Sequence, residues 1–299
     1  MVWNGPKEQE DMCECDPHPI VGVCMLHATL EELDEHSSYD PTEEDKVLRV
    51  SKSSFMNYEY CPRQYYWDKV ILKDLRMPPS DAMVRGSYVH KSLEDFYEAW
   101  QGEHHLMPLF PTGEVCETLA ELEQERLDGW GVENFAPVEY EVKRVYYNAE
   151  YDIVISGFID ALVRHEDGTL AILELKTGTT NESKLSKTRK ELCFYRMVLE
   201  DMDGEIATRF IFVLPDATDE KLLAKLMGQK AKTVWTGSDA GMTVVEKVNM
   251  RSVTSFKQRF ESFLERIKNH EWEMNWDDWR CPQWCPYHMS CEEEMMGIL

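Results

Sequence analysis

The stretch ISGFIDALVRHEDGTLAILELKTG, residues 155–178, decides which fold this sequence predicts. It reads as two strands joined by a turn at 165–168, because an Asp-Gly pair between apolar runs is the strongest short-range signal of a β-hairpin. Side chains alternate along a strand, so Glu174 and Lys176 share one face of the second strand, and Asp160 of the first strand reaches the same face. Two carboxylates and an ammonium on a half-buried sheet are costly to place unless they bind something.

These three charged residues fit the chemistry of phosphodiester cleavage. Two carboxylates hold a divalent cation, and the backbone carbonyl of Leu175 completes its oxygen shell. Such a cation polarises a phosphate and lowers the pKa of a bound water, while Lys176 orients that water or stabilises the charge that develops. We therefore expect Asp160 and Glu174 to bind Mg²⁺ or Mn²⁺.

Two helices, one before and one after the hairpin, offer further site residues. Gly86 and His90 lie four apart and hence on one helix face, where the glycine permits close backbone approach and the histidine supplies a metal ligand. The alternative for His90 is a structural or solvated side chain. The later helix repeats polar residues at helical spacing: Lys184, Lys187, Glu191 and Tyr195. This face is expected to look onto a bound phosphate, unless it is an ordinary surface face.

Composition limits the alternatives. The chain has 299 residues, of which 43% are hydrophobic, and it contains 9 Trp, enough for one large domain or two small ones with a real core. No apolar run is long enough to span a membrane and no signal peptide is visible, so we expect a cytoplasmic protein. In that compartment, the nine Cys are more often metal ligands or core residues than a disulfide framework.

The formal net charge of −24 argues against non-specific nucleic-acid binding by the molecule as a whole. The charge is concentrated at the ends: residues 1–46 hold 13 Asp or Glu and 2 Lys or Arg, and residues 271–299 hold 7 Asp or Glu and 1 Arg. The centre is nearly balanced and leaves room for a basic groove. A cationic cluster follows the hairpin, formed by Lys184, Lys187, Arg189 and Lys190. Its location favours phosphate contact over a merely solvated helix face.

Periodicity places the remaining elements along the chain. Helices are expected at about 51–70, 82–100, 114–130, 184–200 and 252–269, and strands at 138–147, 153–164, 169–176, 207–214, 233–236 and 242–248. This order predicts an α/β fold, a mixed sheet flanked by helices in one compact domain, with a helical subdomain beside it. Residues 1–46 are expected to form an acidic extension that is disordered in part.

The ordered set Gly86-x3-His90, Gly157-Phe158-Ile159-Asp160, Glu174-Leu175-Lys176-Thr177-Gly178 and Glu191-Leu192-Cys193-Phe194-Tyr195 resembles the RecB-type branch of the PD-(D/E)XK nucleases. That branch includes CRISPR-associated RecB-like exonucleases, their phage relatives and the AddB nuclease domain. The resemblance covers roughly residues 51–295. It implies a restriction-endonuclease-like domain over residues 47–299, with its core at about 135–250.

The resemblance also implies an activity, that of a metal-dependent DNA nuclease. The expected enzyme is an exonuclease on single-stranded DNA ends, working with recombination, repair or CRISPR adaptation proteins. Catalytic roles then fall to Asp160, Glu174, Lys176, Glu191 and Tyr195, and metal binding to His90, Asp160, Glu174 and the Leu175 carbonyl. The family usually has Gln where this chain has Glu191, which favours a rival hypothesis: a catalytically silent DNA-binding or assembly module with the same fold.

Four cysteines at the two ends of the expected domain form a second candidate site. Cys61 lies near the first helix, and three more fall within eleven residues of the tail: Cys281, Cys285 and Cys291. Four thiolates suit a 4Fe–4S cluster or a structural Zn²⁺, and the alternative is ordinary buried thiols. A subset of the RecB-like family carries an iron–sulfur cluster on one Cys ahead of the core and three after it, so the resemblance favours the cluster. The subset commonly places two residues between the first two tail ligands, and this chain has three, which keeps Zn²⁺ open.

A third group of soft ligands lies in the acidic extension: Cys13, Cys15, His18, Cys24 and His27. This density of ligands would suit zinc, although the spacing matches no established pattern. Cys116 and Cys193 fall in expected helices and are interpreted as core residues.

Overall fold

The computed structural model describes residues 15–75, 78–100 and 114–298. Its strands are β1 (Ser37–Ser38), β2 (Val47–Ser51), β3 (Pro137–Asn148), β4 (Ile153–Arg164), β5 (Leu170–Leu175), β6 (Arg209–Leu214), β7 (Lys232–Thr236) and β8 (Met242–Lys247). Within the described residues, these strands form one eight-stranded mixed sheet in the order β1-β2-β4-β5-β6-β8-β7, with β3 paired to β4. The predicted mixed α/β fold is confirmed.

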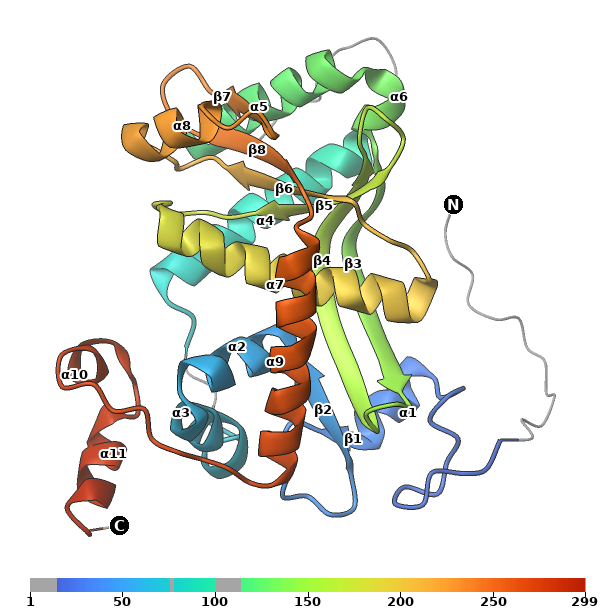
Figure 1. The fold of residues 1–299 in the computed structure, drawn as a ribbon, viewed down its shortest axis with the longest axis vertical. Helices are drawn as coiled ribbons and strands as arrows, with labels where there is room; N and C mark the ends of the chain where they lie inside the picture. The colour runs from blue at the N-terminus through green and yellow to red at the C-terminus, as the bar shows by residue number, and fades with distance from the viewer. Residues whose placement is uncertain (1–14, 76–77, 101–113, 299) are drawn as a thin grey trace.

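The helices flank this sheet (Figure 1). They are α1 (Leu30–Glu35), α2 (Lys52–Tyr60), α3 (Pro62–Tyr66), the π-helix η1 (Trp67–Ile71), α4 (Asp81–Ala99), α5 (Glu114–Trp130), α6 (Val132–Phe135), α7 (Glu182–Asp203), α8 (Glu220–Met227), α9 (Met250–Lys268), α10 (Arg280–Trp284) and α11 (His288–Met295). No helix in the described ranges is long and apolar enough to cross a membrane.

The β4–β5 hairpin forms where the sequence predicts it. The two strands pair antiparallel, with Ala161 opposite Leu173, and this register brings Asp160 beside Glu174. The backbone N–H of Gly168 donates to the carbonyl of His165 at 2.7 Å, and Gly168 has a φ of +77°, a conformation that glycine adopts without a Cβ penalty. The turn therefore fixes the register that places the two acids on one face.

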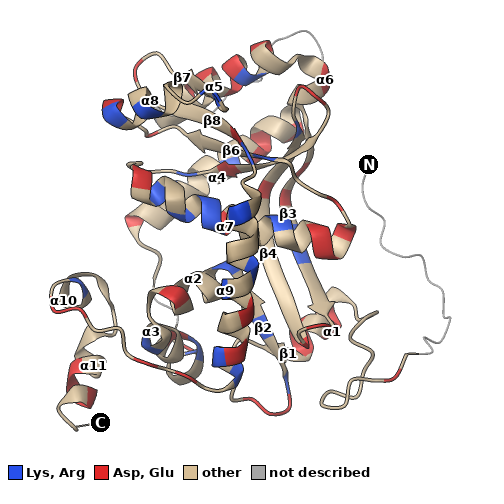
Figure 2. Cartoon of the chain, in the orientation of Figure 1, with Lys and Arg blue, Asp and Glu red and all other residues tan. Residues whose placement is uncertain are grey.

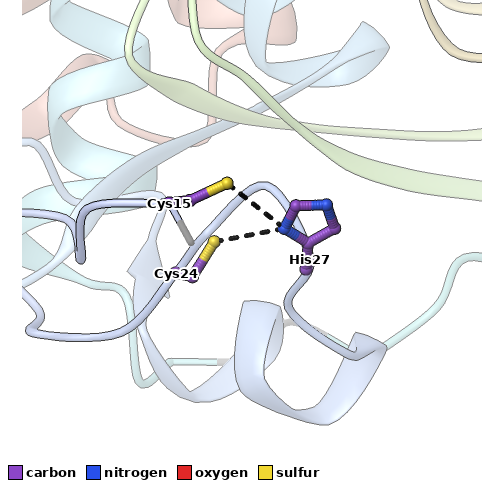
Figure 3. A group of neighbouring side chains, drawn as sticks. All are labelled: Cys15, Cys24 and His27. Atoms are coloured by element: carbon purple, nitrogen blue, oxygen red, sulfur yellow. Dashed lines mark hydrogen bonds between the residues drawn. The ribbon is translucent and has the colours of Figure 1, made fainter. Parts of the chain in front are cut away.

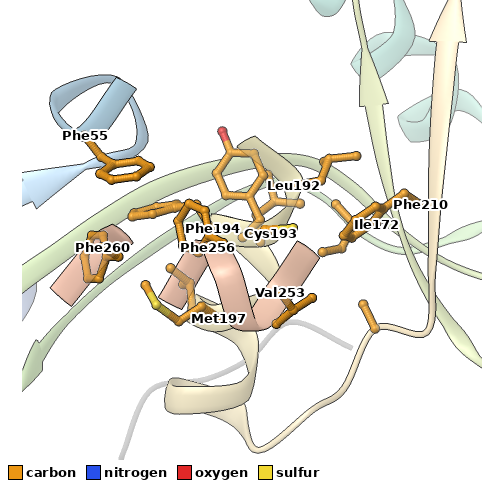
Figure 4. Packing of buried hydrophobic residues seen from close by; sticks show 14 of the residues in the cluster. Phe55, Ile172, Leu192, Cys193, Phe194, Met197, Phe210, Val253, Phe256 and Phe260 are labelled. Atoms are coloured by element: carbon orange, nitrogen blue, oxygen red, sulfur yellow. The ribbon is translucent and has the colours of Figure 1, made fainter. Parts of the chain in front are cut away.

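Each face of the sheet is covered by its own helices. Along β5, Ile172 packs into a core with side chains from α2, α7 and α9, whereas Leu173 and Leu175 pack with α4, α5 and α6. Aromatic rings fill much of the first core, among them Phe194 and Phe256 (Figure 4). The alternation predicted for this strand thus separates two apolar layers, and Glu174 belongs to the α7 side.

Helix α7 connects two parallel strands, β5 and β6, as the predicted crossover helix should. Asn181 caps its N-terminus with a side chain that accepts the backbone N–H of Lys184 at 2.9 Å, and Gly204 caps its C-terminus with a φ of +66°. In Figure 1, α7 and α9 lie across the near face of the sheet. The crossover therefore presents the polar face of α7 to the carboxyl end of β5.

The single helix predicted over about 51–70 is wrong, because the chain breaks at Cys61. That residue has extended backbone (φ −159°, ψ 112°), and Pro62 occupies the first turn of the next helix. Proline disfavours helical geometry in the residue before it, so α2 ends and α3 starts in a new direction. The break leaves Cys61 at a helix boundary that faces the C-terminal tail.

The described part of the acidic extension, residues 15–46, packs onto the end of the sheet. Met25 and Leu33 are buried against Val145 and Val154 of β3 and β4. Strand β2 then pairs in parallel with β4, an addition to the sheet that periodicity did not predict. The tail lies beside α3 (Figure 1), and Tyr287 donates its hydroxyl to Asp68 at 3.2 Å.

Candidate active site

Asp160 is held at the centre of the site by the hairpin itself. Its Oδ2 accepts the backbone N–H of Leu175 at 2.7 Å, which locks the carboxyl across the β4–β5 pair. Burial, followed by the negative charge of Glu174, raises the pKa of Asp160 to about 7. A carboxyl in this state gains from any cation that replaces its proton. Leu175 therefore contributes its backbone to the site, while its side chain packs into the core.

Glu174, Lys176 and Glu191 form one ion-paired group. The Lys176 ammonium lies 2.6 Å from Glu174 Oε1 and 2.9 Å from Glu191 Oε2. Burial opposes the charged form of Lys176, but the carboxylates of Glu174 and Glu191 together outweigh it, and the pKa of the ammonium is raised. Glu191 is likewise buried, and its pKa is nevertheless lowered because Lys176 and Lys52 stand close to it. Lys176 and Glu191 are therefore both favoured in their charged forms beside Glu174.

Lys52 is a site residue that sequence reasoning missed. Its ammonium lies 3.4 Å from both Glu174 Oε1 and Glu191 Oε2 and 4.8 Å from the ring centre of Tyr195. It is placed there because β2 ends at Ser51, which caps α2 through the N–H of Ser54 and makes Lys52 the first helical residue. In the sequence, Lys52 is marked only by the capping serine that precedes it. Its approach to the hairpin depends on the parallel pairing of β2 with β4, which the sequence did not predict.

Helix α4 brings His90 over the hairpin. Its Nδ1 lies 3.5 Å from Asp160 Oδ1 and 3.9 Å from Glu141 Oε1. Burial lowers the pKa of His90, but these two carboxylates outweigh it, and the net direction is upward. Glu141 also went unnoticed in the sequence. It stands in β3 with a φ of +45°, an uncommon conformation for this residue type and one that cannot be read from strand periodicity.

Two contacts fix α4 at this height above β5. Gly86 faces the loop after β5 so closely that an added Cβ would lie 3.3 Å from Thr177 Oγ1. One residue earlier, Arg85 donates to both oxygens of Asp216 at 2.8 and 2.6 Å, and Asp216 also accepts the N–H of Gly178 at 2.6 Å. The glycine and this bridge explain how His90, one turn further on, reaches Asp160.

Tyr195 lies in the wall of the site and not on its surface. Its ring is buried and packs against Gly157, where an added Cβ would meet ring carbon Cε1 at 3.3 Å. Burial raises the pKa of its hydroxyl. The role expected for Tyr195, contact with a substrate backbone, stays a prediction.

The donor set fits a divalent cation. One ligand atom each from His90, Glu141 and Asp160 lies within 4.8 Å of the others. Glu174 Oε2 is buried and has no hydrogen-bond partner among the described residues, although the other oxygen of that carboxylate is paired with Lys176. A buried carboxylate oxygen without a donor is costly unless a cation satisfies it. Oxygen donors with one imidazole suit Mg²⁺ or Mn²⁺.

The cationic cluster beyond the hairpin is only partly available to a ligand. Arg189 pairs with Glu246 at 2.5 Å, and Lys184 donates to the carbonyl of Thr179 at 2.5 Å. Lys187 and Lys190 instead line a surface hollow together with Tyr60 and Trp284. Figure 2 shows several Lys and Arg positions along α7.

The four cysteines converge from the two ends of the chain. Cys61, Cys281, Cys285 and Cys291 line one small cavity between α3 and the tail. Burial is the first cause that raises the pKa of the Cys291 thiol to about 11, and the nearby thiols of Cys285 and Cys61 add to it. The sulfur of Cys281 also accepts a hydrogen bond from the backbone N–H of Asp277 at 3.3 Å. Nowhere in the described chain do three of these sulfurs lie within 4.8 Å of one another.

Comparison with known proteins identifies one family. The family model of the PD-(D/E)XK nuclease superfamily matches residues 49–292. Among solved structures, the crystal structure of SSO0001 is 16% identical with a TM-score of 0.43, and the match covers 81% of this chain and 85% of that chain. No curated protein matches the chain.

Proposed function

The chain belongs to the PD-(D/E)XK nuclease superfamily, and from this premise we propose that it is a metal-dependent DNA nuclease of the RecB-like branch. One observation carries the proposal above all others. Asp160 with its raised pKa, the buried oxygen of Glu174 that no described residue satisfies, and the Lys176 ammonium meet on one face of a single hairpin. Such an arrangement is incomplete without a cation and is suited to a phosphate.

Each residue has a defined task in this proposal. Asp160 and Glu174 would hold Mg²⁺ or Mn²⁺, with His90 as a nitrogen ligand, the Leu175 carbonyl as a further oxygen ligand and Glu141 beside them. When bound, the cation polarises the scissile phosphate and acidifies a water. Lys176 orients the attacking water or stabilises the charge that develops on the phosphate. Glu191 keeps the Lys176 ammonium in place at 2.9 Å.

Single-stranded DNA is the proposed substrate, and the hollow beside α7 supports it. Two ammonium groups, Lys187 and Lys190, line this hollow with the exposed ring of Trp284 and with Tyr60. Cations that follow a backbone and aromatic rings that stack on bases are the two parts of a single-strand binding surface. The charge of Lys187 also helps to lower the pKa of Glu191, so this lysine acts on a residue of the hairpin site. The proposed enzyme is an exonuclease that digests this DNA from its free ends, in recombination, repair or CRISPR adaptation.

A 4Fe–4S cluster on Cys61, Cys281, Cys285 and Cys291 is the proposed structural cofactor. Four thiolates around one Zn²⁺ would stand about 3.8 Å apart, because the Zn–S bond is about 2.3 Å and the site is tetrahedral. The four cysteines line one small cavity, and the resemblance to the cluster-bearing RecB-like subset favours the iron–sulfur core over zinc. Bound there, the cluster would tie α3 to the C-terminal tail and so hold the helical layer on the sheet.

The rival proposal is a silent DNA-binding or assembly module with the nuclease fold. One observation favours it: the Lys176 ammonium is held between two carboxylates, Glu174 and Glu191, which reduces its attraction for a phosphate. The raised pKa of Asp160 speaks against it, because a module without a metal gains nothing from so costly a buried acid.

The first experiment is cleavage of end-labelled single- and double-stranded DNA by anaerobically purified protein with Mn²⁺. Lys176→Ala should keep the fold and metal affinity but lose cleavage by about 10²–10³-fold, the usual effect of removing one group that stabilises transition-state charge. Lys221→Ala, at an exposed position of α8, is the matched control and should cleave normally. Wild-type rates in Lys176→Ala would refute the assignment, and a wild type inert on both DNA forms would favour the silent module.

The second experiment tests the cluster. Wild-type protein should be brown and contain about four iron atoms per chain, whereas Cys285→Ala should lose its iron and melt at a lower temperature. Cys116→Ala, at a buried thiol of α5 hydrogen-bonded to Ser92, controls for the loss of any cysteine and should keep the iron. A colourless wild type with no iron would overturn the proposed cofactor without touching the nuclease assignment.

A further inference from the structure

Three side chains in the N-terminal segment point their donor atoms at one another, far from the hairpin site in sequence. Cys15 Sγ lies 3.7 Å from His27 Nδ1, and Cys24 Sγ lies 3.4 Å from the same nitrogen (Figure 3). All three donor atoms lie within 4.8 Å of one another. Two sulfurs and one imidazole nitrogen therefore surround a common point.

These distances agree with the geometry of a tetrahedral zinc ion. Zn–S bonds of about 2.3 Å and Zn–N bonds of about 2.0–2.1 Å place a sulfur and a nitrogen ligand about 3.6 Å apart at the tetrahedral angle. The two observed separations bracket that value. Hydrogen bonding alone explains them less well, because Nδ1 of an imidazole carries either one hydrogen or one lone pair and serves one thiol at a time.

The fold builds this arrangement by turning the apolar residues of the segment inward. A tight turn spans 18–23, closed by the N–H of His18 donating to the carbonyl of Val23 at 2.8 Å. Val21, Val23 and Met25 pack onto the strand residues of the sheet end, and the cysteines and His27 are left at the surface side. The segment from 15 to 28 contains neither helix nor strand, so a cross-link would add to its stability.

His18, which the sequence grouped with these ligands, is excluded by its contacts. Its Nε2 lies 2.7 Å from Asp152, and its Nδ1 accepts the N–H of Ile20 at 3.2 Å, so both ring nitrogens are engaged. The ring is buried against the sheet and anchors the segment there. Cys13 lies outside the described residues.

We propose that Cys15, Cys24 and His27 bind a structural Zn²⁺ that cross-links the N-terminal segment at residues 15–27. Thiolate and imidazole donors select a borderline-soft cation such as zinc over Mg²⁺ or Mn²⁺. The site is separate in donor chemistry from the acidic hairpin site, which takes a hard cation. Its role is to hold the loop in a fixed shape, because a bound metal that the unfolded chain releases contributes its binding free energy to folding.

Zinc content of the full chain, purified without a metal-binding tag, tests the proposal. His27→Ala and Cys24→Ala should each lose about one zinc ion per chain relative to wild type. The four-cysteine site is intact in every variant, so any metal it holds cancels in the comparison. His36→Ala, which replaces another histidine of the same region at the end of α1, should keep the zinc. His27→Cys supplies a different zinc ligand at the same position and should also keep it.

Two further measurements distinguish the loss of zinc from general misfolding of a variant. Protease cleavage within 15–28 should accelerate in His27→Ala and in chelator-treated wild type, and remain slow in His27→Cys with zinc. DNA cleavage by folded His27→Ala should stay close to wild type, because none of its donor atoms belongs to the hairpin site. Equal zinc in wild type, His27→Ala and Cys24→Ala would overturn the proposal, as would the same zinc loss in His36→Ala.

Discussion

The two faces of the central sheet each bury a group of charged side chains, and the two groups differ in how their charges are satisfied. On the α5 side lies the closed cluster, which we define as Arg126, Glu123 and Tyr97. On the α7 side lies the open cluster, defined as Asp160, Glu174, Lys176, Glu191 and Lys52.

Every charge in the closed cluster has a partner within it or beside it. Arg126 donates to Glu123 at 2.7 Å and to the carbonyl of Phe135 at 2.8 Å, and Tyr97 donates its hydroxyl to Glu123 at 3.0 Å. The guanidinium also lies 4.2 Å from the ring centre of Phe135. Both charged side chains are fully buried. The group is complete without a ligand.

The open cluster is not complete in this sense. Glu174 keeps one buried oxygen without a partner among the described residues, and burial raises the pKa of Asp160 to about 7. Lys176 remains one-third exposed, so the group also opens to solvent. We infer that the two buried charge groups have different roles: the closed cluster fixes how the helices pack, and the open cluster is the proposed site for a cation and a phosphate.

The largest effect on stability is expected from breaking the closed cluster. Arg126→Met should lower the free energy of unfolding by about 3–5 kcal/mol, because it leaves the Glu123 carboxylate buried without a countercharge. Chemical denaturation measures this change. Lys225→Met, which breaks the exposed pair of Lys225 with Glu182, is the control and should change stability by less than about 1 kcal/mol.

A double variant sharpens the same test. Arg126→Met combined with Glu123→Met removes both charges and should recover most of the lost stability, since the cost lies in the orphaned carboxylate and not in the missing pair. If the double variant were as unstable as Arg126→Met alone, packing and not charge would hold this region together.

The next effect concerns pH and the open cluster. In the metal-free protein, native Asp160 keeps its proton up to a pH of about 7, whereas an unfolded aspartate releases it near pH 4. The native state therefore binds more protons in this window, and its stability from this group falls as pH rises from about 4 to 7. Relative to wild type, Asp160→Asn should gain roughly 2–4 kcal/mol across the window, as followed by denaturation at several pH values.

The same denaturation measurements repeated with added Mn²⁺ test whether Asp160 binds a metal. Because the cation competes with the proton on Asp160, its stabilisation of wild type should grow as pH rises through about 7 and be much smaller in Asp160→Asn. Parallel stability curves for the two proteins, with and without Mn²⁺, would contradict the raised pKa and the metal site together.

The smallest effect is expected at Glu191. Glu191→Gln keeps the shape of the side chain but removes one negative charge 2.9 Å from Lys176. The Lys176 ammonium, then paired with Glu174 alone, should bind a phosphate more strongly, with DNA affinity raised a few-fold, or by about 1 kcal/mol. Fluorescence anisotropy with labelled single-stranded DNA measures it. Glu182→Gln, exposed in the first turn of α7, should leave affinity nearly unchanged; weaker binding in Glu191→Gln would show that this carboxylate supports the site.

Much of this molecule was predictable from local sequence. The Asp167-Gly168 turn and the flanking alternation predicted the hairpin, with Asp160 reaching the face of Glu174, and the structure confirms the hairpin and places these two acids side by side. The spacing of Gly86 and His90 predicted one helix face, and the structure places that face above Asp160. These features depend on backbone geometry within short segments, which residue type largely controls.

Other features depend on contacts between distant segments. Nothing local to Lys52 marks it as a site residue, because it reaches Glu174 only through the parallel pairing of β2 with β4. The helix predicted over 51–70 failed at Cys61-Pro62, where a local rule against continuing the helix was available but was outweighed by periodicity. Glu141 takes a positive φ inside a strand, which strand periodicity does not foresee.

The sequence by itself determined the hairpin, its three charged residues and the family to which the chain belongs, because turn chemistry and side-chain alternation act over a few residues. Only the tertiary structure decided which other charges join them, which histidine of the N-terminal segment faces the cysteines, and that four distant thiols line one cavity. Those outcomes follow from packing between elements far apart in sequence, where burial and charge compensation, and not local propensity, select the arrangement.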